Sequence, residues 1–225
     1  MITYKLIRSR RKTTAIHITR DAVLEVRAPL HIPKADIDRF VISKQKWITE
    51  HMSRMEQRLD KKTAFTIDYE SAILLHGVEY PIIAKPGKRA GFNGECFYFP
   101  PGMSHDELKQ ATVQIYKAIA KNSLKARTAE YSAKMNLKPT AVRISSAKTR
   151  WGSCSGKNSI TYSWRLIMAA EDVIDYVVVH ELSHIKEHNH SDRFWSIVEG
   201  VLPDYQARKK KLKLLQERLA TQDWD

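Results

Sequence analysis

The stretch that decides the fold is His180-Glu181-Leu182-Ser183-His184, followed six residues later by His190. Residues four apart on an α-helix lie on one face, so His180 and His184 can direct ring nitrogens at the same point. Glu181 then lies beside that point. The pattern is typical of a catalytic zinc site, in which the ion keeps one position for water and the carboxylate takes the proton of that water.

The third ligand must lie close enough to His180 and His184 to share one ion with them. A straight helix would carry His188 about 12 Å and Glu187 about 10 Å along the axis from His180, too far for one ion to bridge. We therefore expect the helix to end at Asn189 and the chain to fold back. This turn favours His190 as the third ligand over both alternatives.

A short His-Glu-x-x-His pattern also arises by chance, and its alternative interpretation is the polar face of a helix. The apolar run at residues 177–179 argues against that alternative, because a largely buried helix must give its histidines and its glutamate partners. Four of the nine histidines lie within residues 180–190, and no pair of cysteines competes as a metal site. We expect the three histidines to hold Zn²⁺.

The composition is that of a folded protein without a membrane span. The 225 residues are 43% hydrophobic, enough for one large domain or two small ones. The N-terminus lacks an apolar signal core, and no run approaches the roughly 18 apolar residues that span a bilayer. We expect a cytoplasmic protein with no membrane partner and no disulfide between Cys96 and Cys154. Cys154 is interpreted as a small packed residue in a turn, in preference to a nucleophile.

The net charge of +13 is unevenly distributed. Residues 104–170 hold 12 basic and 3 acidic side chains, whereas residues 171–225 hold 8 and 11. The positive charge therefore belongs to what surrounds the expected metal site. This distribution suits an anionic, phosphate-bearing substrate or proximity to nucleic acid, and ordinary solvated helix surface explains it equally well.

The hydrophobic pattern predicts an α+β protein in two parts, divided at Pro100-Pro101-Gly102. The first part, residues 1–102, is an α+β module that is rich in β-strands. Alternation at 14–18 and 23–27 predicts a hairpin, and helical spacing from 34 to about 59 predicts one long helix. Short strands are expected again between 65 and 98.

The second part, residues 103–225, is expected to have the layout of a zincin-like metal-dependent hydrolase domain. A helix should run from Ser104 to about Met135, followed by strands near 141–145 and 159–163. The metal-binding helix should begin near Glu171, and Ser191 should cap the next helix. Helices including the run of lysines at 209–211 complete the domain. In such a layout an edge strand can hold an extended substrate above the ion, but the sequence does not identify that strand.

Three segments together carry a likeness to a known family: Arg143-x-x-x-x-Lys148-x-Arg150-Trp151-Gly152-Ser153-Cys154, residues 175–184, and His190-Ser191-x-x-Phe194-Trp195. They resemble the YgjP-like family of predicted zinc metallopeptidases, and the likeness covers most of the chain. The metal segment is also similar, over fewer residues, to WLM and SprT-type proteases, whose members include enzymes that act on proteins bound to DNA. The resemblance implies that the three histidines are metal ligands and that Glu181 is the catalytic acid/base.

Three functions fit these observations. The first is a zinc-dependent peptidase in which Glu181 activates a metal-bound water. The second is a metal-dependent nucleotide or phosphoanhydride hydrolase that uses the same site and binds phosphate with nearby cations. The third is a nucleic-acid-associated binding protein with a structural metal.

Substrate binding is expected from a basic segment that precedes the metal helix, because a cation beside the ion can bind an anion or stabilise an oxyanion. In the alternative interpretation the tryptophan of this segment belongs to the core, and its cations are exposed or paired with Asp172 and Asp175. The candidate substrate-binding residues are Arg143, Lys148, Arg150 and Trp151.

Overall fold

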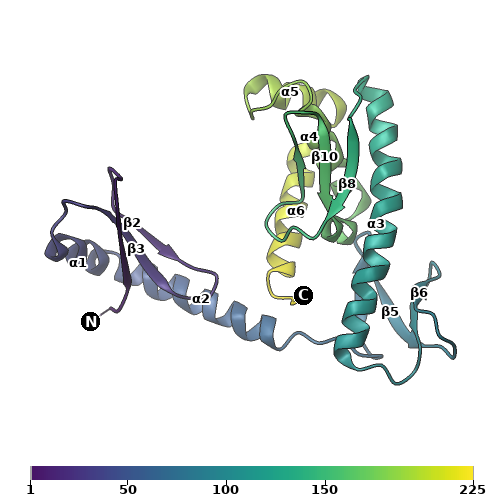
Figure 1. Ribbon diagram of the computed structural model, residues 1–225, viewed down its shortest axis with the longest axis horizontal. Coiled ribbons are helices and arrows are strands. Elements are labelled where there is room, and N and C mark those ends of the chain that lie inside the picture. Colours follow the sequence, from purple (N-terminus) through teal and green to yellow (C-terminus); the bar gives the residue numbers. More distant parts are fainter. Residues whose placement is uncertain (1, 225) are drawn as a thin grey trace. The chain divides into compact units, whose positions relative to one another are not determined.

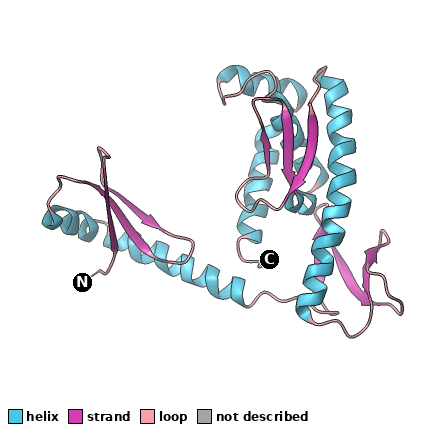
Figure 2. Ribbon diagram, viewed as in Figure 1, coloured by secondary structure: helices cyan, strands magenta, loops and turns pink. Residues whose placement is uncertain are grey.

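The computed structural model describes residues 2–224, which form two compact units (Figures 1 and 2). The first unit comprises residues 2–65 and 219–223, and the second comprises 66–218 and 224. The described chain holds six α-helices and three small mixed sheets, so the expected α+β class is confirmed. The domain boundary after residue 102 stays a prediction, since a compact unit is not by itself an independently folding domain.

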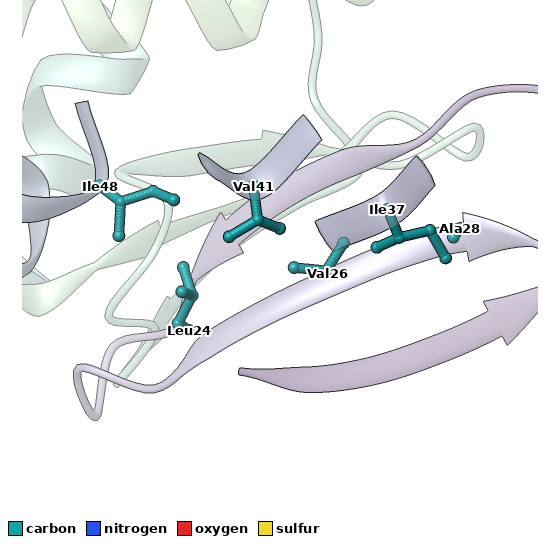
Figure 3. Packing of buried hydrophobic residues seen from close by; sticks show 6 residues of the cluster. All are labelled: Leu24, Val26, Ala28, Ile37, Val41 and Ile48. Atoms are coloured by element: carbon teal, nitrogen blue, oxygen red, sulfur yellow. The ribbon is translucent and has the colours of Figure 1, made fainter. Parts of the chain in front are cut away.

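The first unit is a three-stranded sheet covered by two helices. Strands β2 (Ala15–Ile18) and β3 (Leu24–Pro29) pair antiparallel, which confirms the expected hairpin. Strand β1 (Lys5–Ser9) pairs parallel with β3 and was not expected. Alternate residues of β3 face the helices and build the core with Ile37, Val41 and Ile48 (Figure 3).

The helix expected from 34 to about 59 is divided in two. Helix α1 (Lys34–Ser43) and helix α2 (Gln45–Thr63) are separated at Lys44. The Lys44 N–H bonds the Val41 carbonyl, three residues back, so the regular i to i−4 ladder slips there. The apolar pattern predicted the extent of the helical segment but not this local break.

The second unit begins with a four-stranded sheet in the order β4-β5-β7-β6. Its strands are β4 (Ala72–Leu75), β5 (Val78–Ala84), β6 (Gly91–Phe92) and β7 (Phe97–Phe99), in the predicted segment. Helix α3 (His105–Met135) follows, with a capping box between Ser104 and Glu107 and a left-handed Asn136 at its end. Tyr116 of α3 is fully buried and donates a hydrogen bond to the Leu74 carbonyl, so α3 and this sheet share one core.

A second sheet of this unit packs against the helix over residues 171–183 and has the order β8-β10-β9. Strands β8 (Ala141–Ser145) and β10 (Ser159–Ser163) were predicted and pair parallel. Strand β9 (Gly152–Cys154) pairs antiparallel with β10 and forms an edge of the sheet. Cys154 therefore lies in a strand, where a turn was expected.

The remaining elements complete the unit (Figure 1). A 3₁₀ helix, η1 (Trp164–Met168), leads into α4 (Glu171–Ser183), whose valines are buried as expected. Helices α5 (Asp192–Val201) and α6 (Tyr205–Leu219) follow. Between residues 2 and 224, no helix is both long enough and apolar enough to cross a membrane.

Candidate metal centre

Helix α4 and the turn after it position the three histidines. The helix ends at Ser183 and His184 is its C-cap, so the expected end at Asn189 was wrong. The N–H groups of Lys186 and Glu187 both bond the Ser183 carbonyl, which tightens the chain into a turn directly after the helix. The early turn leaves enough chain for His190 to return to the helix.

Helix α5 begins immediately after His190. Its N-cap is Ser191, as predicted, and the Ser191 Oγ accepts a hydrogen bond from the Phe194 N–H. This cap fixes the direction in which the chain leaves the turn.

His180, His184 and His190 form one cluster in which each offers a ring nitrogen, and these nitrogens all lie within 4.8 Å of one another. The Nε2 atoms of His180 and His190 are 3.1 Å apart. Two nitrogens held about 2.0–2.1 Å from a tetrahedral ion lie about 3.3 Å apart, so the spacing suits one ion. Among residues 2–224 the cluster includes neither His188 nor Glu187.

The protonation of the cluster also suits a metal, which requires neutral imidazoles. The Nδ1 of His184 donates a hydrogen bond to the Glu187 carbonyl at 3.0 Å, because a carbonyl can only accept; the Nε2 of His184 is thereby left as a ligand. Burial, with the neighbouring histidines, lowers the pKa of His180 to about 3. Burial likewise lowers the pKa of His184 below its usual value.

An aromatic wall holds the three rings. Phe194 of α5 is fully buried, and its ring centroid lies 4.9, 4.5 and 4.8 Å from those of His180, His184 and His190. Trp195 stacks on the His190 ring at 5.7 Å. These contacts restrict the orientation of the rings and keep water from one side of the cluster.

Glu181 lies on the same helix, and its side chain meets the edge strand β9. Only 6% of the residue is exposed, and burial raises the pKa of its carboxyl to about 7. The positive charge of Arg150 and a hydrogen bond from the Cys154 N–H oppose that rise in pKa. The carboxyl group is therefore buried and held against strand β9, on the helix that also carries His180.

Gly152 is a site residue that the sequence did not reveal. A Cβ atom at this position would lie 2.5 Å from Oε1 and 2.6 Å from Cγ of Glu181, so only glycine leaves room for the carboxylate. An isolated glycine in a strand often marks such a close approach. The motif containing Gly152 was noted, but β9 was not expected as a strand.

A cationic pocket of about 650 Å³ lies on the β8-β10-β9 sheet. Arg143 and Arg150 line it, as does Lys157, which was not among the candidates. Lys148 and Trp151 do not line it, although Lys148 is exposed and Trp151 is partly buried in the same segment.

The alternative interpretation expected the cations to be exposed or paired with Asp172 and Asp175; Arg143 and Arg150 are exposed, and among residues 2–224 neither pairs with these aspartates. Asp172 pairs with Lys211 at 2.7 Å. Asp175 pairs with Arg127 at 2.7 Å and also approaches Arg208 at 3.8 Å.

Comparison with known proteins identifies the family. Two solved structures of archaeal metallopeptidase zymogens are similar to this chain. Abylysin of Pyrococcus abyssi is 25% identical, with a TM-score of 0.38 over 43% of this chain and 94% of that one. Jannalysin of Methanocaldococcus jannaschii is 22% identical, with a TM-score of 0.37 over 42% and 95%. No curated protein sequence matches significantly. The YgjP-like metallopeptidase domain matches residues 12–214, which confirms the resemblance of the motifs, and the chain belongs to this YgjP-like metallopeptidase family.

Proposed function

We propose that this protein is a zinc-dependent peptidase in which Glu181 is the general base. One observation carries the proposal: three histidine nitrogens lie within 4.8 Å of one another, and the helix that supplies two of these histidines also carries the buried carboxylate of Glu181, which contacts β9. Three histidines are a common ligand set for catalytic zinc, which leaves a fourth position open. Zinc bound there would supply Lewis acidity and lower the pKa of a water to about 7.

The roles of the protein groups follow from their positions. Glu181 takes a proton from the attacking water and returns it to the leaving nitrogen as the peptide C–N bond breaks. A carboxyl whose pKa lies near neutrality suits both transfers. The guanidinium of Arg150, whose charge already acts on Glu181, stabilises negative charge that develops on the peptide carbonyl oxygen.

The role of Glu181 can be tested by Glu181→Gln. Glutamine fills the same space but cannot take a proton, so hydrolysis of casein-type peptides should fall by about 10²–10⁴-fold while zinc content stays unchanged. Glu199→Gln is the matched control, because Glu199 is exposed on α5 and should leave both properties unchanged. A Glu181→Gln protein that cleaves peptides at the wild-type rate would show that the base is misassigned.

A second candidate is hydrolysis of a phosphoanhydride at the same site, which the guanidinium groups of Arg143 and Arg150 in the pocket favour. It predicts that Arg150→Ala weakens turnover of nucleoside triphosphates far more than turnover of peptides. Equal losses on both substrates, or no turnover of nucleotides by the wild type, would reject it.

A further inference from the structure

The charged residues that line the pocket on the β8-β10-β9 sheet are all basic. Its cations come from three separate segments: Arg143 from β8, Arg150 from the loop before β9, and Lys157 from the turn between β9 and β10. No acidic residue lines it. Hydroxyl groups make up much of the rest, from Thr140, Ser153, Ser155, Ser159 and Thr161.

Among the described residues the cations of this pocket form no ion pair, unlike other cations of the unit, and Arg150 acts on the Glu181 carboxyl only through its charge. Arg127, Arg208 and Lys211 all form ion pairs with aspartates. Within residues 2–224, neither Arg143, Arg150 nor Lys157 forms an ion pair, and all three are exposed. Three unpaired cations around one concave surface create a positive potential that favours an anionic ligand.

Strand β9 connects this pocket to the candidate metal centre. Cys154 lines the pocket, and its N–H bonds Glu181. Arg150 lines the pocket as well, and its charge acts on Glu181. Gly152 faces Glu181 and the next residue, Ser153, faces the pocket, so β9 presents the pocket on one face and the proposed base on the other. A peptide that pairs with the edge of β9 would reach both.

The arrangement along β9 suits an extended chain with several negative charges. Arg150 precedes this strand and Lys157 follows it, so the cations flank the strand at both ends. The register places Ser153 opposite Thr161 and Thr161 opposite Arg143, so these residues share the face that forms the pocket. A single phosphate is more often held by cations and backbone N–H groups that converge on one point.

The polar backbone of β9 also favours a peptide. The Trp151 carbonyl and the Ser155 N–H bond β10, so in an antiparallel ladder the backbone groups of Gly152 and Cys154 point away from β10. The Cys154 N–H already bonds Glu181, which leaves the N–H and carbonyl of Gly152 and the carbonyl of Cys154 to face a peptide. An extended peptide can pair with such an edge, and its alternate side chains then fall on the pocket face.

We infer that this pocket binds acidic side chains of the substrate, so that the protein cleaves peptides with Asp or Glu beside the scissile bond in preference to neutral or basic ones. The inference rests on the proposed peptidase function and adds its substrate class. Planar guanidinium groups pair well with carboxylates, and the hydroxyls of the lining can donate further hydrogen bonds to them.

The test uses zinc-loaded full-length protein and peptides that differ only in the flanking residues, which are acidic, neutral or basic. The acidic peptides should have a kcat/KM about tenfold above the neutral ones, and the preference should shrink as salt is raised. The double variant Arg143→Glu/Lys157→Glu should reverse the preference. The matched control is Lys121→Glu/Lys125→Glu, which changes the net charge by the same amount at exposed positions of α3. This variant should keep the preference for acidic peptides.

The outcomes separate this inference from the proposed function. Cleavage of all peptides at one rate, or an acidic preference that survives Arg143→Glu/Lys157→Glu, would overturn the inference and leave the peptidase standing. If no peptide is cleaved, the proposed function fails. Fluorescence anisotropy of a labelled acidic peptide then tests whether the pocket binds acidic side chains. Binding that is lost in the Arg143→Glu/Lys157→Glu protein supports it, whereas no binding, together with cleavage of nucleoside triphosphates, rejects it.

Discussion

Replacement of Gly152 by alanine should impair catalysis without removing the metal. The added Cβ would lie 2.6 Å from Cγ and 2.7 Å from Cδ of Glu181, whereas ordinary contacts are 3.4–4 Å. The clash reaches Cγ, so rotation of the carboxylate alone cannot relieve it. The side chain must move by roughly 1 Å, and a displacement of that size can reduce a rate about 10²-fold.

We therefore expect kcat of Gly152→Ala to fall about 100-fold for a peptide substrate. Zinc content should equal that of the wild type, because the three atoms nearest the added Cβ all belong to Glu181 and none to the clustered histidines. The assay combines hydrolysis of a fluorogenic peptide with metal analysis of the same preparation. Gly156→Ala is the matched control: it lies in the same hairpin, its Cβ would meet no atom within 4 Å, and it should behave as wild type.

Two results would refute this reasoning. If Gly152→Ala kept the wild-type kcat, the position of Glu181 against β9 would not matter for the reaction. If the variant lost its zinc, the substitution would act on the histidine cluster, and the separation between metal binding and the base would be wrong.

Substitutions at three further positions test the fold of the second unit by denaturant unfolding. Gly77→Ala should lower the free energy of unfolding by about 2–4 kcal/mol, because φ is +80° and the new Cβ would lie 2.8 Å from the Ala170 Cβ; an unchanged value would contradict the close packing of this turn on residue 170. Ser104→Ala should cost about 1 kcal/mol through loss of the α3 cap, and Ser104→Gly only a few tenths; equal losses would argue against a capping role. Phe194→Ala should cost about 3–5 kcal/mol and weaken zinc binding, since the ring packs on all three histidines; wild-type zinc affinity would show that this wall does not orient them.

The histidine cluster could be predicted from the spacing of residues in the sequence around His180. The buried run before His180, the need for a turn and the cap at Ser191 together predicted that His190 would approach the helix. The position of the turn was wrong because the helix end depends on hydrogen bonds to the Ser183 carbonyl, which no side-chain pattern encodes. The earlier turn is what brings His190 back, because a helix that continued to Asn189 would carry residue 190 about 15 Å along the axis from His180.

Features that depend on distant pairing were not predictable in the same way. Strand β9 has only three residues, Gly-Ser-Cys, which lack both the length and the β-branched side chains that indicate a strand. Its contact with Glu181 and the pocket beside it arise only when β9 pairs with β10. Strand β1 was missed because it pairs with β3, which follows β2 in the sequence, and no local pattern indicates such a pairing.

The central claim is that His180, His184 and His190 together hold one metal ion. Its most direct test is a zinc titration of metal-free wild type and of His190→Ala, with bound zinc measured per chain. The wild type should take up one zinc per chain, and His190→Ala should bind it far more weakly, since two ligands remain. A wild type that takes up no zinc, or a His190→Ala protein that binds it as tightly as the wild type, would contradict the claim.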